Sequence, residues 1–336
     1  MSDLRIAVLG AGMMGADHVA RITGRISGAR VTVVNDCLTE KAEQVAASVP
    51  GARVVTDAFD AIADNDVDAV LLATPGPTHE KQLLACLEHR KPVLCEKPLT
   101  TEAETSLQVV RREADLEKPL IQVGFMRRFD PEYQHLKLLI DGGELGQPLV
   151  MHCVHRDPAV SPTFNTAMII KDSLVHEVDV TRFLFSEEIA SVQIITPTPN
   201  SAAPDGLQDP QIAIFETASG RHVDVEVFVT TGVAYEVRTE VVGEHGSATI
   251  GLDVGLVRRS APGIWGGRIT PGFRERFRTA YDVQVQRWVD AVRAGTNVDG
   301  PTAWDGYAAA AVCEAGVRSL DTGERVDVEL SFPRNK

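Results

Sequence analysis

Short apolar runs alternate with amphipathic stretches along the first 125 residues of the chain. The runs that predict strands are residues 4–9, 31–34, 67–73, 92–95 and 120–125. They are continuously apolar, which is typical of strands buried on both faces of a parallel sheet. The stretches between them that predict helices are residues 12–26, 39–48, 57–63, 78–90 and 101–114. This alternation indicates repeated β-α-β units and an open, doubly wound parallel sheet.

The pattern changes after residue 125. The helices expected there are residues 130–141, 172–185, 281–294 and 303–320. The strands expected there are residues 148–156, 211–216, 222–229, 235–242, 247–252 and 326–330. Several of these strands alternate apolar and polar positions, and turn signals at 219–220 and 243–246 join neighbours into hairpins, which predicts a mainly antiparallel sheet. We therefore expect an α/β protein with two domains, residues 1–125 and residues 126–336.

Composition and charge narrow the possible functions. The 336 residues include 33 Lys and Arg against 47 Asp and Glu, a net charge of −14. A surface this acidic repels phosphate backbones and anionic lipids, so neither nucleic acid nor a membrane is an expected partner. No uncharged apolar run approaches the roughly 20 residues that a membrane helix needs. The five cysteines form no C-x-x-C pair, which argues against disulfides and a zinc knuckle and indicates the reducing cytoplasm.

A glycine-rich loop follows the first predicted strand. It reads Gly10-Ala11-Gly12-Met13-Met14-Gly15, a G-x-G-x-x-G pattern. The first glycine allows a tight turn, the second lets the backbone approach a pyrophosphate, and the third lets helix and strand pack closely. Taken alone, the stretch also fits a plain glycine turn or part of a short signal peptide. The predicted strand before it and helix after it favour a dinucleotide site, with the phosphates at the helix N-terminus.

An acidic residue follows the second predicted strand. Asp36 lies near the roughly 20-residue offset expected for the acid that binds the adenosine ribose. A carboxylate there accepts hydrogen bonds from the ribose hydroxyls and repels a 2′-phosphate. Cys37 follows where an arginine would favour that phosphate, although Lys41 lies one turn further on. We expect NAD rather than NADP as the cofactor.

The segment Cys95-Glu96-Lys97-Pro98 follows the predicted strand 92–95. Ligands of open α/β sheets bind at the carboxyl ends of the strands, so Lys97 is a candidate to contact a substrate oxygen. Partial desolvation there would lower the pKa of its ammonium group. An ordinary surface Glu-Lys pair after a strand is the alternative interpretation.

Asp172, His176 and Asp179 have the spacing i, i+4, i+7, which places them on one stripe of a helix. Histidine titrates near neutral pH and can take a proton from an alcohol, and a carboxylate one turn away can orient the imidazole. A solvated polar helix face is the simpler alternative. Metal binding is the competing chemistry, but Lys97 would add a positive charge and no cysteine pair completes a ligand set, so we expect no metal.

Further motifs are Ala73-Thr74-Pro75 with His79, Phe-Met-Arg-Arg-Phe-Asp at 125–130, His-Cys-Val-His-Arg at 152–156 and Ser-Leu-Val-His-Glu-Val-Asp at 173–179. Together with the glycine loop and Glu96-Lys97-Pro98, they resemble the glucose–fructose oxidoreductase/inositol dehydrogenase/rhizopine-catabolism (Gfo/Idh/MocA) family over nearly the whole chain. The stretches at 152–156 and 172–179 are similar to its inositol-oxidising branch. The resemblance implies an N-terminal Rossmann domain and a C-terminal α/β domain. It also implies that the large, open, mainly antiparallel sheet of the second domain forms the interface of a homotetramer.

The resemblance also implies roles for individual residues. The catalytic residues implied are Lys97, Asp172 and His176. The cofactor contacts implied or expected are Gly10, Gly12, Met13, Met14, Gly15, Asp36, Ala73, Thr74, Pro75, His79, Glu96 and Lys97. The substrate contacts implied are Lys97, Arg127, His155, Asp172, His176, Asp179, Tyr235 and Tyr281.

The activity implied is the NAD-dependent oxidation of a ring secondary alcohol of myo-inositol to the keto-inositol. In this interpretation His176 takes the hydroxyl proton, Lys97 stabilises the negative charge on the reacting oxygen, and Asp172 holds the hydroxyl or the imidazole in place. The expected partner is then a small polyol. The alternatives are a dehydrogenase of another cyclitol or sugar, such as scyllo-inositol or glucose, and a non-catalytic sensor of a dinucleotide or sugar. The presence of all three catalytic residues weighs against a sensor.

Overall fold

The computed structural model describes residues 2–252, 257–261, 263–266 and 270–331. These residues divide into two compact units, each described here by itself. The first unit holds residues 2–126, 279–310 and 331, and the second holds the described residues of 127–278 and 311–330. The sequence predicted that residues 279–310 belong to the second domain, 126–336. In the structure this segment belongs to the first unit.

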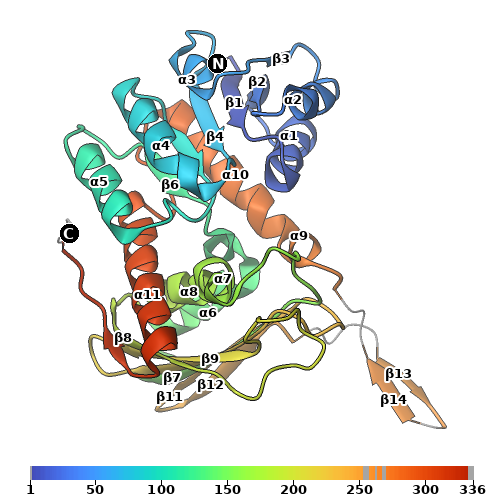
Figure 1. Cartoon of the computed structure of the whole chain (residues 1–336), viewed down its shortest axis with the longest axis vertical. Helices are drawn as coiled ribbons and strands as arrows, with labels where there is room; N and C mark the ends of the chain where they lie inside the picture. The colour runs from blue at the N-terminus through green and yellow to red at the C-terminus, as the bar shows by residue number, and fades with distance from the viewer. Residues whose placement is uncertain (1, 253–256, 262, 267–269, 332–336) are drawn as a thin grey trace. The chain divides into compact units, whose positions relative to one another are not determined.

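A six-stranded parallel sheet forms the centre of the first unit, in the order β3-β2-β1-β4-β5-β6 (Figure 1). Its strands are β1 (Leu4–Leu9), β2 (Ala29–Asn35), β3 (Arg53–Val54), β4 (Ala69–Leu72), β5 (Val93–Cys95) and β6 (Ile121–Val123). All four residues of β4 are buried, as the uninterrupted apolar run predicted. Only β3, which has two residues, was not predicted. The strand order reverses between β1 and β4, and sheets of this kind bind ligands at the carboxyl ends of the strands on either side of such a reversal.

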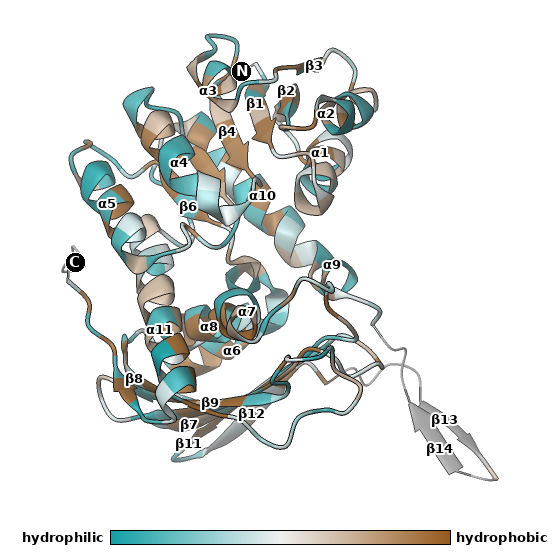
Figure 2. Ribbon diagram, viewed as in Figure 1, coloured by the Kyte–Doolittle hydropathy of each residue, from teal (hydrophilic) through white to brown (hydrophobic). Residues whose placement is uncertain are grey.

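Helices cover this sheet. They are α1 (Met13–Arg25), α2 (Thr39–Ala46), α3 (Ala58–Ala63), α4 (His79–Glu88), α5 (Ala103–Ala114), α10 (Arg278–Ala294) from residue 279 and the start of α11 (Ala303–Thr322). Val19 and Ile22 of α1 share one apolar core with Val285, Trp288 and Val289 of α10. Figure 2 shows brown strands inside the unit and teal outward surfaces on α2, α4 and α5. Burial of apolar surface therefore explains why α10, distant in sequence, packs here.

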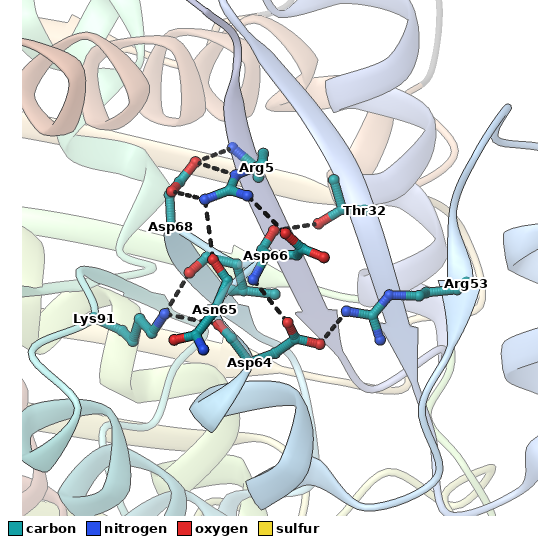
Figure 3. A network of polar contacts seen from close by, with 9 residues as sticks. Arg5, Thr32, Arg53, Asp64, Asn65, Asp66, Asp68 and Lys91 are labelled. Carbon is teal, nitrogen blue, oxygen red and sulfur yellow. Dashed lines mark hydrogen bonds and ion pairs between the residues drawn. The ribbon is translucent and has the colours of Figure 1, made fainter.

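Ion pairs join the amino ends of β1 and β4 (Figure 3). Arg5 of β1 donates from Nε and Nη2 to the two carboxylate oxygens of Asp68, at 3.0 and 2.7 Å, and from Nη1 to Asp66 at 3.0 Å. Nearby, Asp64 pairs with Arg53, and its backbone carbonyl accepts from the ammonium group of Lys91 at 3.0 Å. Because the strands are parallel, this network lies at their amino ends. The glycine loop lies at the opposite ends, since it follows the carboxyl end of β1.

A seven-stranded sheet forms the second unit, in the order β12-β11-β7-β10-β9-β8-β15. Its strands are β7 (Pro148–Arg156), β8 (Ile189–Ile195), β9 (Gln211–Thr217), β10 (His222–Phe228), β11 (Glu236–Gly243), β12 (Gly246–Ile250) and β15 (Val326–Asp327). β7 and β10 are parallel and the other neighbours are antiparallel, so the expected mainly antiparallel sheet is confirmed. Burial alternates along β9, β10 and β11, and Figure 1 shows α6 (Pro131–Asp141), α7 (Thr166–Met168) and α8 (Val175–Phe185) on one face.

The remaining elements of the second unit are short. β13 (Val257–Ser260) and β14 (Gly263–Gly266) form a separate hairpin, and α9 (Phe273–Arg276) precedes α10. Within the described residues, none of the helices combines the length and the apolar character needed to cross a bilayer.

The segment predicted as one helix over 172–185 begins differently. A π-helical turn, η3, spans Ile169–Leu174, and the α-helix α8 begins only at Val175. A π turn is wider than an α turn, so Asp172 and His176 do not keep the regular α-helical offset. Ten of the eleven residues of α8 are buried, including His176 and Asp179. A solvated polar face is therefore wrong for these two residues, whereas Asp172 is exposed.

Candidate active site

The glycine loop joins the end of β1 to the start of α1. Gly10 has a φ of +93°, and a Cβ on it would lie 2.5 Å from the carbonyl oxygen of Ala73. A Cβ on Gly15 would lie 1.7 Å from the carbonyl oxygen of Gly10. Gly12 differs, because no heavy atom lies within 4 Å of its Cβ position. The fold itself thus needs the first and third glycines, while the space beside Gly12 is open to a ligand.

The N-terminus of α1 supplies hydrogen-bond donors next to that space. Gly12 is the N-cap residue, and no side chain caps the first turn. The backbone N–H of Ala16 donates to the carbonyl of Gly12 at 2.9 Å, so the N–H groups of Met13, Met14 and Gly15 precede the first intrahelical bond. Uncapped N–H groups and the positive end of the helix dipole fit the phosphates of a dinucleotide.

Asp36 lies directly beside the glycine loop. Its carboxylate accepts hydrogen bonds from the backbone N–H groups of Ala11, at 2.8 Å, and Leu38, at 2.9 Å. Burial alone would raise the pKa of this carboxyl, but these backbone donors outweigh it and hold the pKa below its usual value. Asp36 is half-buried and ionised at neutral pH, which suits an acceptor for ribose hydroxyls and disfavours a phosphate at the same place.

The segment of residues 73–75 leaves the carboxyl end of β4 and is pinned by His79. Nε2 of this histidine lies 2.8 Å from the carbonyl oxygen of Thr74, and Nδ1 lies 2.8 Å from the carbonyl oxygen of Pro98. The ring is 1% exposed. His79 therefore connects the segment after β4 to the segment after β5, where Lys97 lies. Both of its ring nitrogens face backbone carbonyls, so a direct contact with the cofactor stays a prediction.

Glu96 is held by a buried chain of side chains from α1. Its Oε1 lies 2.7 Å from Nε2 of His18, and Nη1 of Arg21 lies 3.0 Å from Nδ1 of the same ring. Because an arginine only donates, Nδ1 must accept, and His18 therefore donates its Nε2–H to Glu96. Arg21 also donates to Asp17, at 2.6 Å, and to Asp282, at 2.8 Å.

Tyr281 of α10 completes this cluster. Its ring meets the ring of His18 edge to face, with centroids 5.9 Å apart, and the guanidinium of Arg21 lies 4.9 Å from its centroid. Tyr281 is 3% exposed. Since Lys97 directly follows Glu96, the cluster fixes the backbone next to the candidate catalytic lysine. His18 and Arg21 received no role from the sequence, although a histidine and an arginine on the buried side of α1 were the available signal.

In the second unit, a buried ionic cluster lies next to His176. Glu177 follows it on α8 and pairs with Arg127 through Oε1 and with Nδ1 of His155 through Oε2, at 3.1 Å. The rings of His155 and His176 are 6.2 Å apart between centroids. Nη2 of Arg127 lies 3.3 Å from Nδ1 of His155, and Oδ2 of Asp157 lies 3.4 Å from Nε2.

The charges of this cluster shift the affinities of its members for protons. Burial would lower the pKa of His155, but the negative charge of Glu177 and the hydrogen bonds to Asp157 and Glu177 raise it to about 9. Burial would raise the pKa of Glu177, but the charges of Arg127 and His155 lower it to about 2. At neutral pH the pair is therefore an imidazolium and a carboxylate.

Two further predicted substrate contacts lie in the second unit. Tyr235 packs its ring edge to face against His155, with centroids 5.8 Å apart, and burial raises the pKa of its phenol. Asp179 is 1% exposed, and Arg128 donates from Nε to both of its oxygens, at 3.0 Å, and from Nη2 to Oδ1, at 2.6 Å. The structure therefore brings Arg127, His155, His176 and Tyr235 together, and gives Asp179 an arginine partner that the spacing did not reveal.

Glu177 is the main residue that the sequence reasoning missed. It lies inside a recognised motif, but its position next to His176 was the one sequence signal that it belongs to the site. Charged residues on helices are usually exposed, so its burial was not expected. Across the described ranges, no group of three or more His, Cys, Asp or Glu side chains has an arrangement that could hold a metal ion.

Comparisons with known proteins identify the family of this chain. The model of the oxidoreductase family with an NAD-binding Rossmann fold (GFO_IDH_MocA) matches residues 4–125, and the GFO/IDH/MocA C-terminal domain matches residues 133–249. Inositol 2-dehydrogenase 2 of Mycolicibacterium vanbaalenii is 75% identical over 331 residues, covering 98% of this chain and 97% of the relative. Inositol 2-dehydrogenase of Rhodococcus erythropolis is 72% identical over 332 residues, covering 98% and 96%.

A solved structure is similar over the same length. The myo-inositol dehydrogenase from Lactobacillus casei, crystallised with NAD(H) and myo-inositol, superposes with a TM-score of 0.95 at 35% identity, covering 99% of this chain and 98% of that one. The resemblance drawn from the motifs is therefore confirmed. The chain belongs to the Gfo/Idh/MocA family of oxidoreductases, with an NAD-binding Rossmann domain.

Proposed function

We propose that this protein is an NAD-dependent dehydrogenase that oxidises a ring secondary alcohol of myo-inositol to the keto-inositol. The observation that carries the proposal is the 75% identity, over 98% of the chain, with a protein named inositol 2-dehydrogenase. Identity this high over both units favours conservation of the reaction as well as the fold.

The first unit has the features that NAD requires. The uncapped N-terminus of α1 and the open space at Gly12 fit the pyrophosphate, and the ionised Asp36 fits the adenosine ribose. The other cofactor contacts in this proposal are Gly10, Met13, Met14, Gly15, Ala73, Thr74, Pro75, His79, Glu96 and Lys97. When bound, NAD supplies the nicotinamide ring that accepts a hydride from the carbinol carbon.

Three side chains carry the proton and charge in this proposal. His176 takes the proton of the reacting hydroxyl as general base, a role that typically contributes about 10²–10⁴ in rate. Lys97 donates a hydrogen bond to the reacting oxygen and stabilises the negative charge that develops on it. Asp172 orients the hydroxyl or the imidazole. The buried chain through Glu96 supports the role of Lys97, because it holds the neighbouring residue in place.

Recognition of a neutral polyol needs many hydrogen-bonding groups rather than one charge clamp. We assign this to Lys97, Arg127, His155, Asp172, His176, Asp179, Tyr235 and Tyr281. The second unit then contributes most of the substrate contacts, and the first holds the cofactor. What supports this division is the clustering of Arg127, His155, His176 and Tyr235 within the second unit.

We also propose that the protein acts as a cytoplasmic homotetramer, with the open face of the seven-stranded sheet as the interface. On that face the exposed side chain of Ile195 accompanies ion pairs of Arg156 with Glu226 and Glu236. All five cysteines are free, which fits a reducing compartment. Sedimentation of the purified protein at several concentrations tests the tetramer.

The activity is tested by measuring NADH formation with a panel of inositol isomers and hexoses. We expect the highest kcat/KM with myo-inositol. A higher value with scyllo-inositol or glucose would replace the substrate. Tight NAD binding without NADH from any polyol would contradict the reaction itself.

The assigned roles are tested by Lys97→Ala and His176→Ala, which should each lower kcat by at least about 100-fold while NAD still binds. Matched controls are Lys81→Ala and His89→Ala, since both residues are exposed at α4 or just after it. We expect both controls to keep normal turnover. Near-normal turnover in a Lys97 or His176 variant would remove that residue from the mechanism.

A further inference from the structure

Glu177 has a buried carboxylate, and each of its two oxygens contacts a different cationic group. It follows His176 on α8 and is 1% exposed. Oε1 accepts from Nη1 of Arg127, and Oε2 lies 3.1 Å from Nδ1 of His155. A carboxylate removed from water is stable only when cations and donors replace its hydration. Glu177 is thus the shared anion between two separate cationic groups.

The two cationic groups depend on this anion in turn. Arg127 lies in η2 (Met126–Phe129) and is 1% exposed, and His155 lies in β7 and is 3% exposed. Nη2 of Arg127 lies only 3.3 Å from Nδ1 of His155. Without a carboxylate between them, two buried positive groups at this distance would repel each other. Asp157, at 3.4 Å from Nε2 of His155, reaches only the far side of the ring.

We propose that Glu177 is a positioning residue, whose single carboxylate fixes the orientations of Arg127 and His155 next to His176. The inference rests on the function proposed above, in which Arg127 and His155 contact the polyol and His176 takes its proton. Glu177 is not among the predicted substrate contacts, and its two oxygens lie against Arg127 and His155.

The charge state of His155 follows from the same geometry. The titratable and charged groups that surround its ring are Arg127, Asp157, His176, Glu177 and Tyr235. With protons on both nitrogens, the ring donates Nδ1–H to Glu177 and directs Nε2–H toward Asp157. A neutral ring protonated at Nε2 would accept at Nδ1 from Nη2 of Arg127, at 3.3 Å, but the same lone pair would face the carboxylate of Glu177 at 3.1 Å. The raised pKa of His155, about 9, agrees with the charged form.

The kinetic test compares Glu177→Gln, which removes the charge and keeps the shape, with Glu188→Gln. Glu188 pairs with Arg182 in the same unit and is 30% exposed on its side chain, so it controls for the loss of an ordinary ion pair. We expect Glu177→Gln to raise KM for myo-inositol about tenfold, the loss of one charged hydrogen bond, with little change in KM for NAD. The alkaline limb of kcat/KM, meaning the pH above which its value falls, should move toward neutral pH by about one unit or more. The reason is that His155 loses the Glu177 carboxylate that stabilises its charged form. The control should change neither quantity. An unchanged KM and limb in Glu177→Gln would overturn the proposal.

The second test needs no turnover and follows the His155 ring proton by NMR in the intact protein. In the unaltered chain we expect it to titrate near pH 9, and in Glu177→Gln near or below the ordinary histidine value of about 6.5. Titration near 6.5 in the unaltered chain would overturn the proposal. If no polyol is oxidised at all, the proposed function fails, yet this titration still decides the role of Glu177. If Glu177→Gln does not fold, Glu177→Asp replaces it, and its shorter carboxylate should move the titration of His155 below pH 9. An unchanged titration near pH 9 would count against the proposal.

Discussion

Replacement of Gly15 by alanine tests whether the start of α1 packs directly against the glycine loop. The added Cβ would lie 1.7 Å from the carbonyl oxygen of Gly10, whereas real Cβ atoms keep at least 3.0 Å from such an atom. Both sides of this contact are backbone, so no side chain can rotate away. The start of α1 must therefore move away from the end of β1 by more than an ångström.

The cost of that movement follows from the packing around it. Overpacking a tight site costs typically 1–3 kcal/mol, and a backbone-to-backbone clash belongs at the upper end, about 3 kcal/mol. For a chain of this size we expect Tm to fall by roughly 4 °C. The same movement carries the N–H groups of α1 away from the pyrophosphate, so NAD affinity should fall at least about tenfold.

Gly12→Ala is the matched control, because no heavy atom lies within 4 Å of its Cβ position. Its Tm should stay within about 2 °C of the original, as expected for a change at a helix N-cap. Its NAD affinity should still fall, since the methyl group enters the space assigned to the pyrophosphate. Thermal unfolding and calorimetric titration with NAD separate the two effects. Normal Tm and affinity in Gly15→Ala would refute the seating of α1, and normal affinity in Gly12→Ala would refute the place of the pyrophosphate.

Further predictions concern the other charged groups. Asp36→Asn should raise KM for NAD about tenfold and increase the relative kcat/KM with NADP, and an unchanged ratio of the two efficiencies would contradict the ribose contact. The pairings of His155 with Glu177 and Asp157 should together contribute roughly 3 kcal/mol to the free energy of unfolding, fully present below pH 6.5 and lost as pH rises through about 9. Urea unfolding across pH should show this loss in the original chain and not in His155→Gln. At acid pH the contribution of Glu177, fully present above pH 4.5, is lost as pH falls through about 2. Asp68→Asn should lower Tm by about one or two degrees and leave NAD affinity unchanged, because its pairing with Arg5 lies at the opposite edge of the sheet; weaker NAD binding would show that the network reaches the cofactor.

Much of the first unit could be predicted from the chain alone because its signals are local. Uninterrupted apolar runs specify strands buried on both faces, and the predicted β1 has the same bounds as the observed strand, Leu4–Leu9. The glycine loop could also be predicted from the sequence. The positive φ of Gly10 and the close backbone approach at Gly15 each exclude a side chain at that position. The Asp36 carboxylate lies beside that loop because β1 and β2 are neighbours in a parallel sheet, a consequence of the β-α-β order.

The partners of charged side chains were decided only by tertiary structure. Arg127 and Glu177 are 50 residues apart, and His155 lies 22 residues before Glu177, yet one buried carboxylate joins all three. The π turn before α8 also changed which residues share a face, so a count of four along the chain did not describe the geometry of Asp172 and His176. Periodicity determines which side of an element is apolar. The strength of an ion pair depends instead on distance and burial, and those exist only once distant segments have packed together.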